Sequence, residues 1–154
     1  MLLCDRSMEV STVFFDISKA FDSVPHLPLL RKLFVIKVNP YSRKWVHSSL
    51  SGREQYVVVN GAKSSVLPVV SGIPQGLVLG SLLFLIYIND ATCVVSNGKM
   101  VVYADDIALY QIIIHSPKDY FLVQYDIDAV LEWTTANYLA FNYRKCCHLL
   151  FSRK

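Results

Sequence analysis

The stretch VVYADDIALY, from Val101 to Tyr110, places two aspartates side by side in otherwise apolar sequence. A buried carboxylate costs several kcal/mol unless something compensates it, and two adjacent carboxylates also repel each other. The longer segment KMVVYADDIALYQIII predicts two strands, with Ala104, Asp105 and Asp106 near the bend between them. Any account of the fold must therefore explain why two carboxylates stand at this bend.

A third aspartate lies in a similar setting. VSTVFFDIS, from Val10 to Ser18, predicts a buried strand that contains Asp16. We expect Asp16, Asp105 and Asp106 to converge from adjacent strands and hold divalent cations, because Mg²⁺ prefers one or two carboxylates completed by waters and phosphate oxygens. Two such ions about 4 Å apart assist phosphoryl transfer. From spacing alone, a polar turn explains Asp105 and Asp106 equally well, and a strand-end hydrogen bond is the simpler explanation of Asp16.

Composition narrows the class of protein. The 154 residues are 53% hydrophobic and 18% charged, which excludes a disordered chain and allows one domain with a real core. The longest apolar run, Leu77 to Ile88, is too short for a membrane helix of about 20 residues, so it predicts a buried helix. No basic leader precedes an apolar segment at the N-terminus, so we expect no signal peptide.

Cysteine and charge patterns bear on location and partners. The four cysteines lack CxxC spacing, which favours an intracellular location, cytoplasmic or nuclear. Cys146-Cys147-His148 has no second ligand pair at finger-like spacing, so we expect structural residues there rather than a metal site. The net charge is +3, and residues 144–154 carry four positive charges and no acid. That tail suits a polyanionic partner and suits a solvated tail equally well.

The segments after the first strand predict helices and a hairpin. LLRKLF predicts a short helix after Pro25 and Pro28, and Pro40 predicts the start of another that closes near Gly52. In QYVVVNGAKSSVLPVV, Asn60-Gly61 suits a tight hairpin turn. The residues expected on the apolar side of the two helices are Leu29, Leu30, Leu33 and Phe34 in the first, and Trp45, Val46 and Leu50 in the second.

A further helix and a final strand complete the pattern. Ser116 as N-cap, Pro117 at the first helical position and Asp119 three residues after the cap predict a helix start. The tail segment LAFNYRKCCHLLF predicts one or two more strands. Antiparallel strands with helices on one face predict an α+β domain. The expected apolar stripe of this helix is Leu122, Tyr125, Ala129 and Trp133.

Four motifs in order resemble the reverse transcriptase of non-LTR (LINE-type) retrotransposons, in particular the jockey-like elements of animal genomes. They are FFDISKAFDSVPH, SGREQYVVVNGAKSS, SGIPQGLVLGSLLFLIYIND and YADD, and the tail NYLAFNYRKCCHLLFSRK follows them. The resemblance covers nearly the whole chain. It implies that residues 1–154 are a partial reverse transcriptase domain, the polymerase palm, with an antiparallel sheet backed by helices and with fingers and thumb largely missing.

The resemblance implies catalytic roles for matching positions. Asp16 and Asp105 would be metal ligands, with Asp106 the second carboxylate of the pair and Tyr103 beside them in the substrate site. Phe21 matches an aromatic residue beneath the incoming sugar, where a ring excludes a 2′-hydroxyl and selects deoxynucleotides. Without the family, a core phenylalanine would be the better explanation of Phe21.

Other matches concern the template and the leaving group. Lys145 in NYRKC matches a lysine near the pyrophosphate, a general acid for the leaving group, although phosphate contact or simple solubility would also explain it. Arg53 is expected to meet a backbone phosphate. The loop that family members lay against the nascent base pair and template corresponds to Gly72, Pro74, Gln75 and Gly76.

The chain also departs from the family pattern. Where the family has PQGSxLGP, this chain has Leu77 and Ser81 at the Ser and Pro positions. The fingers segment upstream of Asp16 is expected to be missing, as are the primer-gripping hairpin, the thumb, and the endonuclease-like and zinc-knuckle segments. These would be other parts of a larger retrotransposon polyprotein.

The implied function is that of an RNA-directed DNA polymerase. A primer 3′-hydroxyl would attack the α-phosphate of a dNTP with two Mg²⁺ ions, Mn²⁺ being able to substitute, on an RNA template with a DNA primer and no membrane. A second hypothesis is a non-catalytic retrotransposon relic that at most binds nucleic acid. Leu77, Ser81 and the short length favour the relic, whereas three intact aspartates oppose it. An unrelated α+β binding protein would require four accidental motif matches.

Overall fold

The structure, a computed structural model, describes residues 9–76, 78–114 and 117–152. The chain divides into two compact units, one made of residues up to Ala20 and from Ile88 onward, the other of Phe21–Tyr87. The prediction of one partial domain over residues 1–154 stays a prediction. Among the described residues, no helix is both long and apolar enough to cross a membrane.

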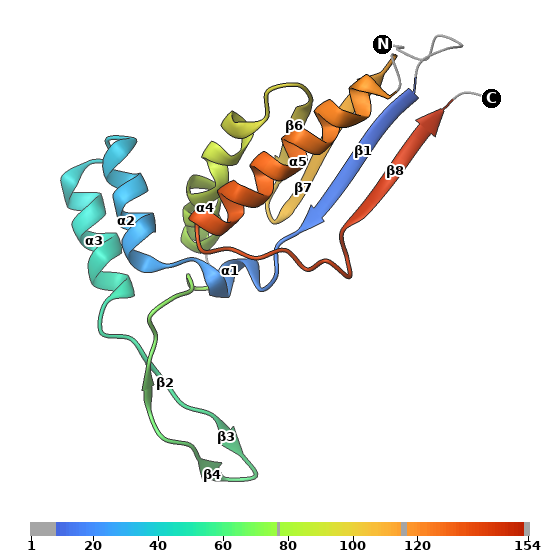
Figure 1. Cartoon of the computed structure of the whole chain (residues 1–154). Helices are drawn as coiled ribbons and strands as arrows, with labels where there is room; N and C mark the ends of the chain where they lie inside the picture. The colour runs from blue at the N-terminus through green and yellow to red at the C-terminus, as the bar shows by residue number, and fades with distance from the viewer. Residues whose placement is uncertain (1–8, 77, 115–116, 153–154) are drawn as a thin grey trace. The chain divides into compact units, whose positions relative to one another are not determined.

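The first unit is built on a four-stranded antiparallel sheet with the order β6-β7-β1-β8 (Figure 1). The helix α5 (Lys118–Ala136) lies along this sheet, and the 3-10 helix η1 (Asn89–Val94) precedes β6. The predicted first strand, hairpin and final strand are confirmed, and with them the α+β class. The strands are β1 (Glu9–Asp16), β6 (Lys99–Tyr103), β7 (Asp106–Ile113) and β8 (Cys147–Ser152).

Side chains of β1 alternate between the two faces of the sheet. Val13 and Phe15 are buried on the face that α5 covers, and their partners across β7 are the buried Leu109 and Ile107. Phe14, on the other face, is 39% exposed. Because side chains alternate along a strand, Asp16 lies on the same face as Phe14. The apolar side chains of β1 that pack toward α5 are therefore on one side of the sheet, and the strand-end aspartate is on the other.

The predicted start and apolar stripe of α5 need correction. Pro117 is the N-cap rather than the first helical residue, and Ser116, the predicted N-cap, lies outside the described residues. The predicted stripe is confirmed at Trp133, which is buried, but it is wrong at Tyr125, which is 63% exposed, while Leu122 and Ala129 are half-buried. Two polar residues among the buried ones obscure the hydrophobic period. The buried residues of α5 are Val123, Asp126, Val130, Trp133 and Thr134.

Asp126 fixes the loop that leads into β6. Its carboxylate is completely buried and accepts hydrogen bonds from the backbone amides of Ser96, Asn97 and Gly98 and from the Asn97 side-chain amide, at 2.6–3.3 Å. A buried carboxylate is tolerated when hydrogen bonds replace its lost hydration. Gly98 fits this loop because a Cβ there would lie 2.9 Å from the carbonyl oxygen of Tyr110.

The second unit contains the predicted helices. After the short α1 (Ala20–Ser23) come α2 (His26–Val35), α3 (Pro40–Leu50) and α4 (Val78–Ile88). Pro40 begins α3 as predicted, and the Asn39 side chain caps it by accepting from the Tyr41 amide at 2.8 Å. The predicted apolar faces are wrong at Phe34 and Trp45, which are 65% and 59% exposed. The predicted residues that are buried are Leu29, Leu33, Val46 and Leu50.

The predicted hairpin between α3 and α4 is present. β2 (Glu54–Gln55) pairs with β5 (Leu67–Pro68), and β3 (Val58–Val59) pairs with β4 (Ala62–Lys63). Asn60 and Gly61 have φ angles of 50° and 83°. Positive φ at both central residues is what the tight hairpin turn requires, so the prediction from Asn60-Gly61 is confirmed.

Candidate active site

Two carboxylates stand opposite each other at one end of the sheet. Asp16 ends β1 and Asp106 begins β7, and the two are Cα partners in the antiparallel register. Directly opposed residues place their side chains on the same face, with Cβ atoms about 4.5–5.5 Å apart. The Asp16 side chain is 25% exposed, and Asp106 is exposed. Two like charges at this separation repel each other, so the pair favours a cation between or beside them.

The turn between β6 and β7 carries the third aspartate. Tyr103 and Asp106 are Cα partners, so Ala104 and Asp105 form a two-residue turn. Ala104 has a φ of 53°, a conformation that costs about 1–2 kcal/mol for a residue with a Cβ. Tyr103 is 81% exposed beside the carboxylates. Backbone strain of this kind is concentrated at functional sites in proteins.

Lys145 lies beside the same carboxylates. Its Nζ donates to Asp16 Oδ1 at 3.2 Å, and its side chain is 66% exposed. The backbone holds it there, because the Asn142 amide donates to the Asp16 carbonyl at 2.8 Å and the Lys145 amide donates to the Asn142 carbonyl at 2.9 Å. Phe141 stacks on Phe15 with ring centroids 4.9 Å apart. The segment before β8 is thus tied to the end of β1, and Lys145 partly neutralises Asp16.

These carboxylates suit a hard divalent cation whose coordination shell is completed by substrate oxygens. Two opposed carboxylates with a third in the adjoining turn are the oxygen ligands that Mg²⁺ takes, and this ion keeps open positions for water and phosphate. Over the described ranges, no group of three His, Cys, Asp or Glu side chains is close enough to hold a metal ion by itself. Asp16 and Asp106 are brought together by the register, while Asp105 lies in the turn.

Phe21 and Arg53 belong to the second unit. The ring of Phe21 is half-buried and stacks on Phe84, with centroids 4.8 Å apart. Its backbone carbonyl accepts from the Ile73 amide at 2.9 Å, so the residue is anchored to the start of the glycine loop. Arg53 is half-buried, and its carbonyl accepts from the Val69 amide at 2.9 Å.

The glycine loop from Gly72 to Gly76 is held by specific contacts. Gly72 has a φ of 91°, and a Cβ there would lie 3.1 Å from the Asp22 carbonyl oxygen. Gln75 Nε2 donates to Asp22 Oδ1 at 3.1 Å. Gly76 has a φ of 78°, again in the region that favours glycine. The conformation of this loop therefore depends on glycine at both ends.

Two residues that hold this loop were not predicted from the sequence. His26 Nε2 donates to the Gly72 carbonyl at 2.8 Å. Gly80, inside α4, faces the carbonyl of Pro74 so closely that any Cβ would overlap it. A glycine inside an apolar helix is a signal of close backbone approach, and Gly80 could have been recognised on that ground. Leu77, the departure from the family pattern, lies outside the described residues, and Ser81 is exposed.

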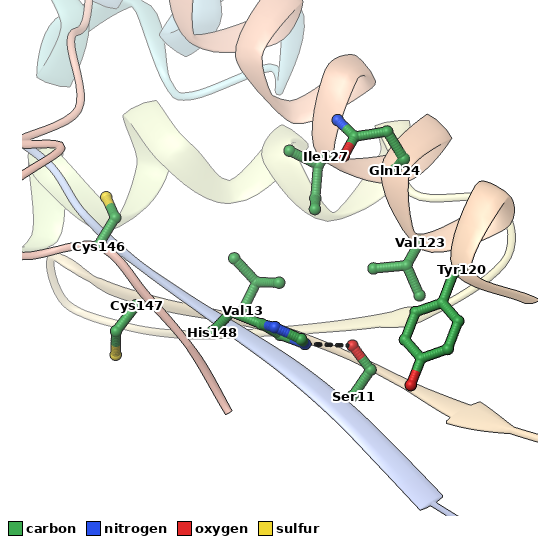
Figure 2. Close-up of a pocket in the computed structure, with 9 residues that line it drawn as sticks. All are labelled: Ser11, Val13, Tyr120, Val123, Gln124, Ile127, Cys146, Cys147 and His148. Atoms are coloured by element: carbon green, nitrogen blue, oxygen red, sulfur yellow. Dashed lines mark hydrogen bonds between the residues drawn. The ribbon is translucent and has the colours of Figure 1, made fainter. Parts of the chain in front are cut away.

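A separate cavity of about 460 Å³ lies between α5 and the β1–β8 side of the sheet (Figure 2). Ser11 Oγ and His148 Nε2 are hydrogen-bonded there at 2.9 Å. Tyr120 Oη donates to Glu9 Oε2 at 3.3 Å. Burial of the phenol, and then the neighbouring Glu9 carboxylate, raises the pKa of Tyr120. Ser11 and His148 therefore pair with each other, whereas Tyr120 and Gln124 pair with Glu9 and Asp128 outside the lining.

The adjacent thiols do not gather at one point of this cavity. Figure 2 shows the side chains of Cys146 and Cys147 on opposite sides of the strand, and His148 directed toward Ser11. Alternation along an extended strand accounts for this.

Comparisons with known proteins agree on one family. The family model for reverse transcriptase (RNA-dependent DNA polymerase) matches residues 3–153. The RNA-directed DNA polymerase from mobile element jockey of Drosophila funebris is 32% identical over 155 aligned residues, which cover 96% of this chain and 17% of that protein. The probable RNA-directed DNA polymerase from transposon X-element of Drosophila melanogaster is 33% identical over 109 residues, covering 68% of this chain.

Solved structures agree in fold. A telomerase from Candida tropicalis matches 92% of this chain and 26% of its own, with a TM-score of 0.67 and 12% identity. At that identity the likeness concerns the fold alone. The chain spans about a sixth of the length of the jockey polymerases that it matches. On the family match and the jockey relatives together, the chain belongs to the reverse transcriptase family and is homologous to the RNA-directed DNA polymerases of jockey-like non-LTR retrotransposons.

Proposed function

We propose that this chain is the catalytic palm of an RNA-directed DNA polymerase encoded by a jockey-like retrotransposon. The observation that carries the proposal is the pairing of Asp16 with Asp106 at the end of the sheet, with Asp105 in the adjoining turn. A structural role explains a single strand-end aspartate well, but it does not explain two carboxylates directly opposite each other beside a third.

The reaction is nucleotidyl transfer. The primer 3′-oxygen forms a bond to the α-phosphorus of a dNTP, the bond from that phosphorus to the pyrophosphate oxygen breaks, and the hydroxyl proton passes to solvent water. Asp16, Asp105 and Asp106 would hold two Mg²⁺ ions, which supply Lewis acidity for the attacking and leaving oxygens when bound. Positioning and electrostatics carry most of such a reaction.

Lys145 has two roles in this proposal. Before substrate arrives, its ammonium group pairs with Asp16 at 3.2 Å and offsets the repulsion between the carboxylates. An exposed ion pair is worth at most about 1 kcal/mol, so it breaks readily. Once released, Lys145 donates a proton to the departing pyrophosphate, which carries the negative charge that forms there.

We also assign substrate contacts to residues of the second unit. Phe21, held by its stacking on Phe84, would exclude a 2′-hydroxyl from the incoming nucleotide. The backbone of the loop from Gly72 through Pro74 and Gln75 to Gly76 would approach the template base pair. We assign Arg53 to a backbone phosphate. In the first unit, we assign Tyr103 to the substrate beside the carboxylates.

The partners in this proposal are an RNA template, a DNA primer and a dNTP, inside the cell. Because the curated relatives are about six times as long as this chain, we expect the isolated 154 residues to extend a primer weakly or not at all. Activity of the isolated chain is therefore a poor test, and metal binding is a better one.

Mn²⁺ binding to the purified chain, followed by the EPR signal of the free ion, tests the proposal. We expect Asp16→Asn and Asp106→Asn each to weaken binding by at least about tenfold, the effect of losing about 1.4 kcal/mol. Glu54→Gln, which removes one exposed carboxylate from a two-residue strand of the other unit, is the control and should bind as the wild type does. Equal binding by Asp106→Asn and the wild type would favour the relic hypothesis.

A further inference from the structure

The second unit has an apolar groove on its surface. It has a volume of about 660 Å³ and is bounded by α2, α3 and α4. Leu33, Val46 and Leu83 form its buried floor, while Tyr41 and Trp45 at its rim are 85% and 59% exposed. Large exposed aromatic side chains beside an apolar floor are typical of a surface that receives a partner.

The surroundings of this groove carry charge of one sign. Between Asp22 and Glu54 the sequence has six Lys or Arg residues and no acid. Lys37 and Lys44 are exposed and lie beside groove residues, since Lys37 precedes Val38 in the chain and Lys44 comes three residues after Tyr41 on α3, the spacing of neighbours on a helix surface. A partner that fits must therefore combine apolar side chains with acidic ones.

The chain itself carries a helix face of that kind. The outward face of α5 presents Phe121, Tyr125, Asp128 and Glu132, at spacings of four, three and four residues, and all four are exposed. This spacing places them on one stripe, opposite the buried Val130. The exposed acids of α5 are Asp128 and Glu132, both on this stripe, so the stripe is negatively charged and complements the basic groove.

We propose that the groove of one copy of this chain receives the α5 stripe of a second copy. Phe121 and Tyr125 fill the apolar floor, and Asp128 and Glu132 meet Lys37 and Lys44. Helices with anchors at such spacing commonly bind apolar grooves in this way. The contact joins two different surfaces, so it is heterologous and can extend beyond a dimer.

A nucleic acid is the other class of partner that a basic surface suggests. Phosphates gain from Lys37 and Lys44, but they gain nothing from the aliphatic floor formed by Leu33, Val46 and Leu83. The acidic and aromatic stripe uses both parts of the groove, and for that reason the observations favour a second copy.

Sedimentation velocity over a range of protein concentrations tests this inference. We expect the wild type to associate and Lys44→Glu and Glu132→Lys each to weaken association by about tenfold or more. Mixing the two single variants allows two attractive contacts between them, one with both charges reversed and one with the wild-type charges, so it should restore association. High salt should weaken all attractive combinations. Lys63→Glu, outside the groove, should associate as the wild type does, and circular dichroism should show each variant folded.

Three results would overturn the inference. The first is a wild-type chain that stays monomeric at every concentration. The second is association that neither charge reversal changes. The third is a monomer that binds single-stranded RNA through this surface, with binding lost in Lys44→Glu, because it would assign the groove's basic rim to nucleic acid instead.

Discussion

Ala104 occupies a backbone conformation that glycine tolerates better. Its φ of 53° lies in the turn that carries Asp105. We predict that Ala104→Gly raises the free energy of unfolding by about 1 kcal/mol, because relief of left-handed strain exceeds the entropic cost of glycine. Urea unfolding measures this change.

Ala108→Gly provides the matched control, because Ala108 lies four residues away inside β7. Glycine inside a strand costs about 0.5–1 kcal/mol relative to alanine, so this variant should be less stable than the wild type. If Ala104→Gly also loses stability, the turn is not strained.

If Asp16 is a metal ligand, as proposed, Lys145 competes with the cation for it. Its Nζ lies 3.2 Å from Asp16 Oδ1, so we predict that Lys145→Gln binds Mn²⁺ severalfold more tightly than the wild type in the absence of substrate. This gain in binding free energy cannot exceed the free energy of the exposed ion pair that is removed, up to about 1 kcal/mol. Arg144→Gln removes the neighbouring positive charge and should have a smaller effect. Mn²⁺ titrations that rank the two variants the other way would refute the competition.

At the scale of elements, Asp126 joins α5 to the loop before β6. We predict that Asp126→Asn lowers the free energy of unfolding by about 3 kcal/mol, because an amide can accept at one oxygen only and turns N–H groups toward backbone donors. Asp128→Asn, two residues along the same helix and exposed, should change stability by less than about 0.5 kcal/mol. Similar losses in both variants on chemical denaturation would show that the buried hydrogen bonds contribute little.

At Gly80 we predict a stability change opposite to the one that helix propensity alone would give. Glycine to alanine inside a helix ordinarily adds about 1 kcal/mol of stability. Here the added methyl group would overlap the Pro74 carbonyl oxygen, so Gly80→Ala should lower stability by about 2 kcal/mol, as overpacking does. Ser81→Ala, at the exposed neighbouring position, serves as the control. A rise in the melting temperature of Gly80→Ala would show that the loop yields.

The elements that could be predicted are those with strong local signals. Asn60-Gly61 determined a hairpin turn through backbone conformation alone, and the run from Val10 to Ser18 had the β-branched composition of a buried strand. The α5 stripe was only partly predicted because the buried face includes Asp126, whose partners are loop amides that no hydrophobic pattern marks. Likewise, Trp45 has a large apolar side chain of the kind usually found in a core, but it lies at the groove rim.

At the scale of the whole molecule, the division into two compact units was not predicted. No linker composition separates Ala20 from Phe21 or Tyr87 from Ile88, and compactness depends on long-range contacts that single-sequence patterns do not report. The order of the strands in the sheet could not be predicted for the same reason. The approach of Asp16 and Asp106 could be anticipated because uncompensated carboxylates in two apolar strands required a common explanation.

In the proposed function, Asp16 and Asp106 hold divalent cations at the end of the sheet. Mapping Mn²⁺-induced broadening of backbone amide NMR signals, at substoichiometric metal, is the sharpest test of this metal site. We expect broadening centred on residues 15–17 and 104–107, and its loss in Asp106→Asn. Broadening centred elsewhere, or unchanged by Asp106→Asn, would refute the assignment.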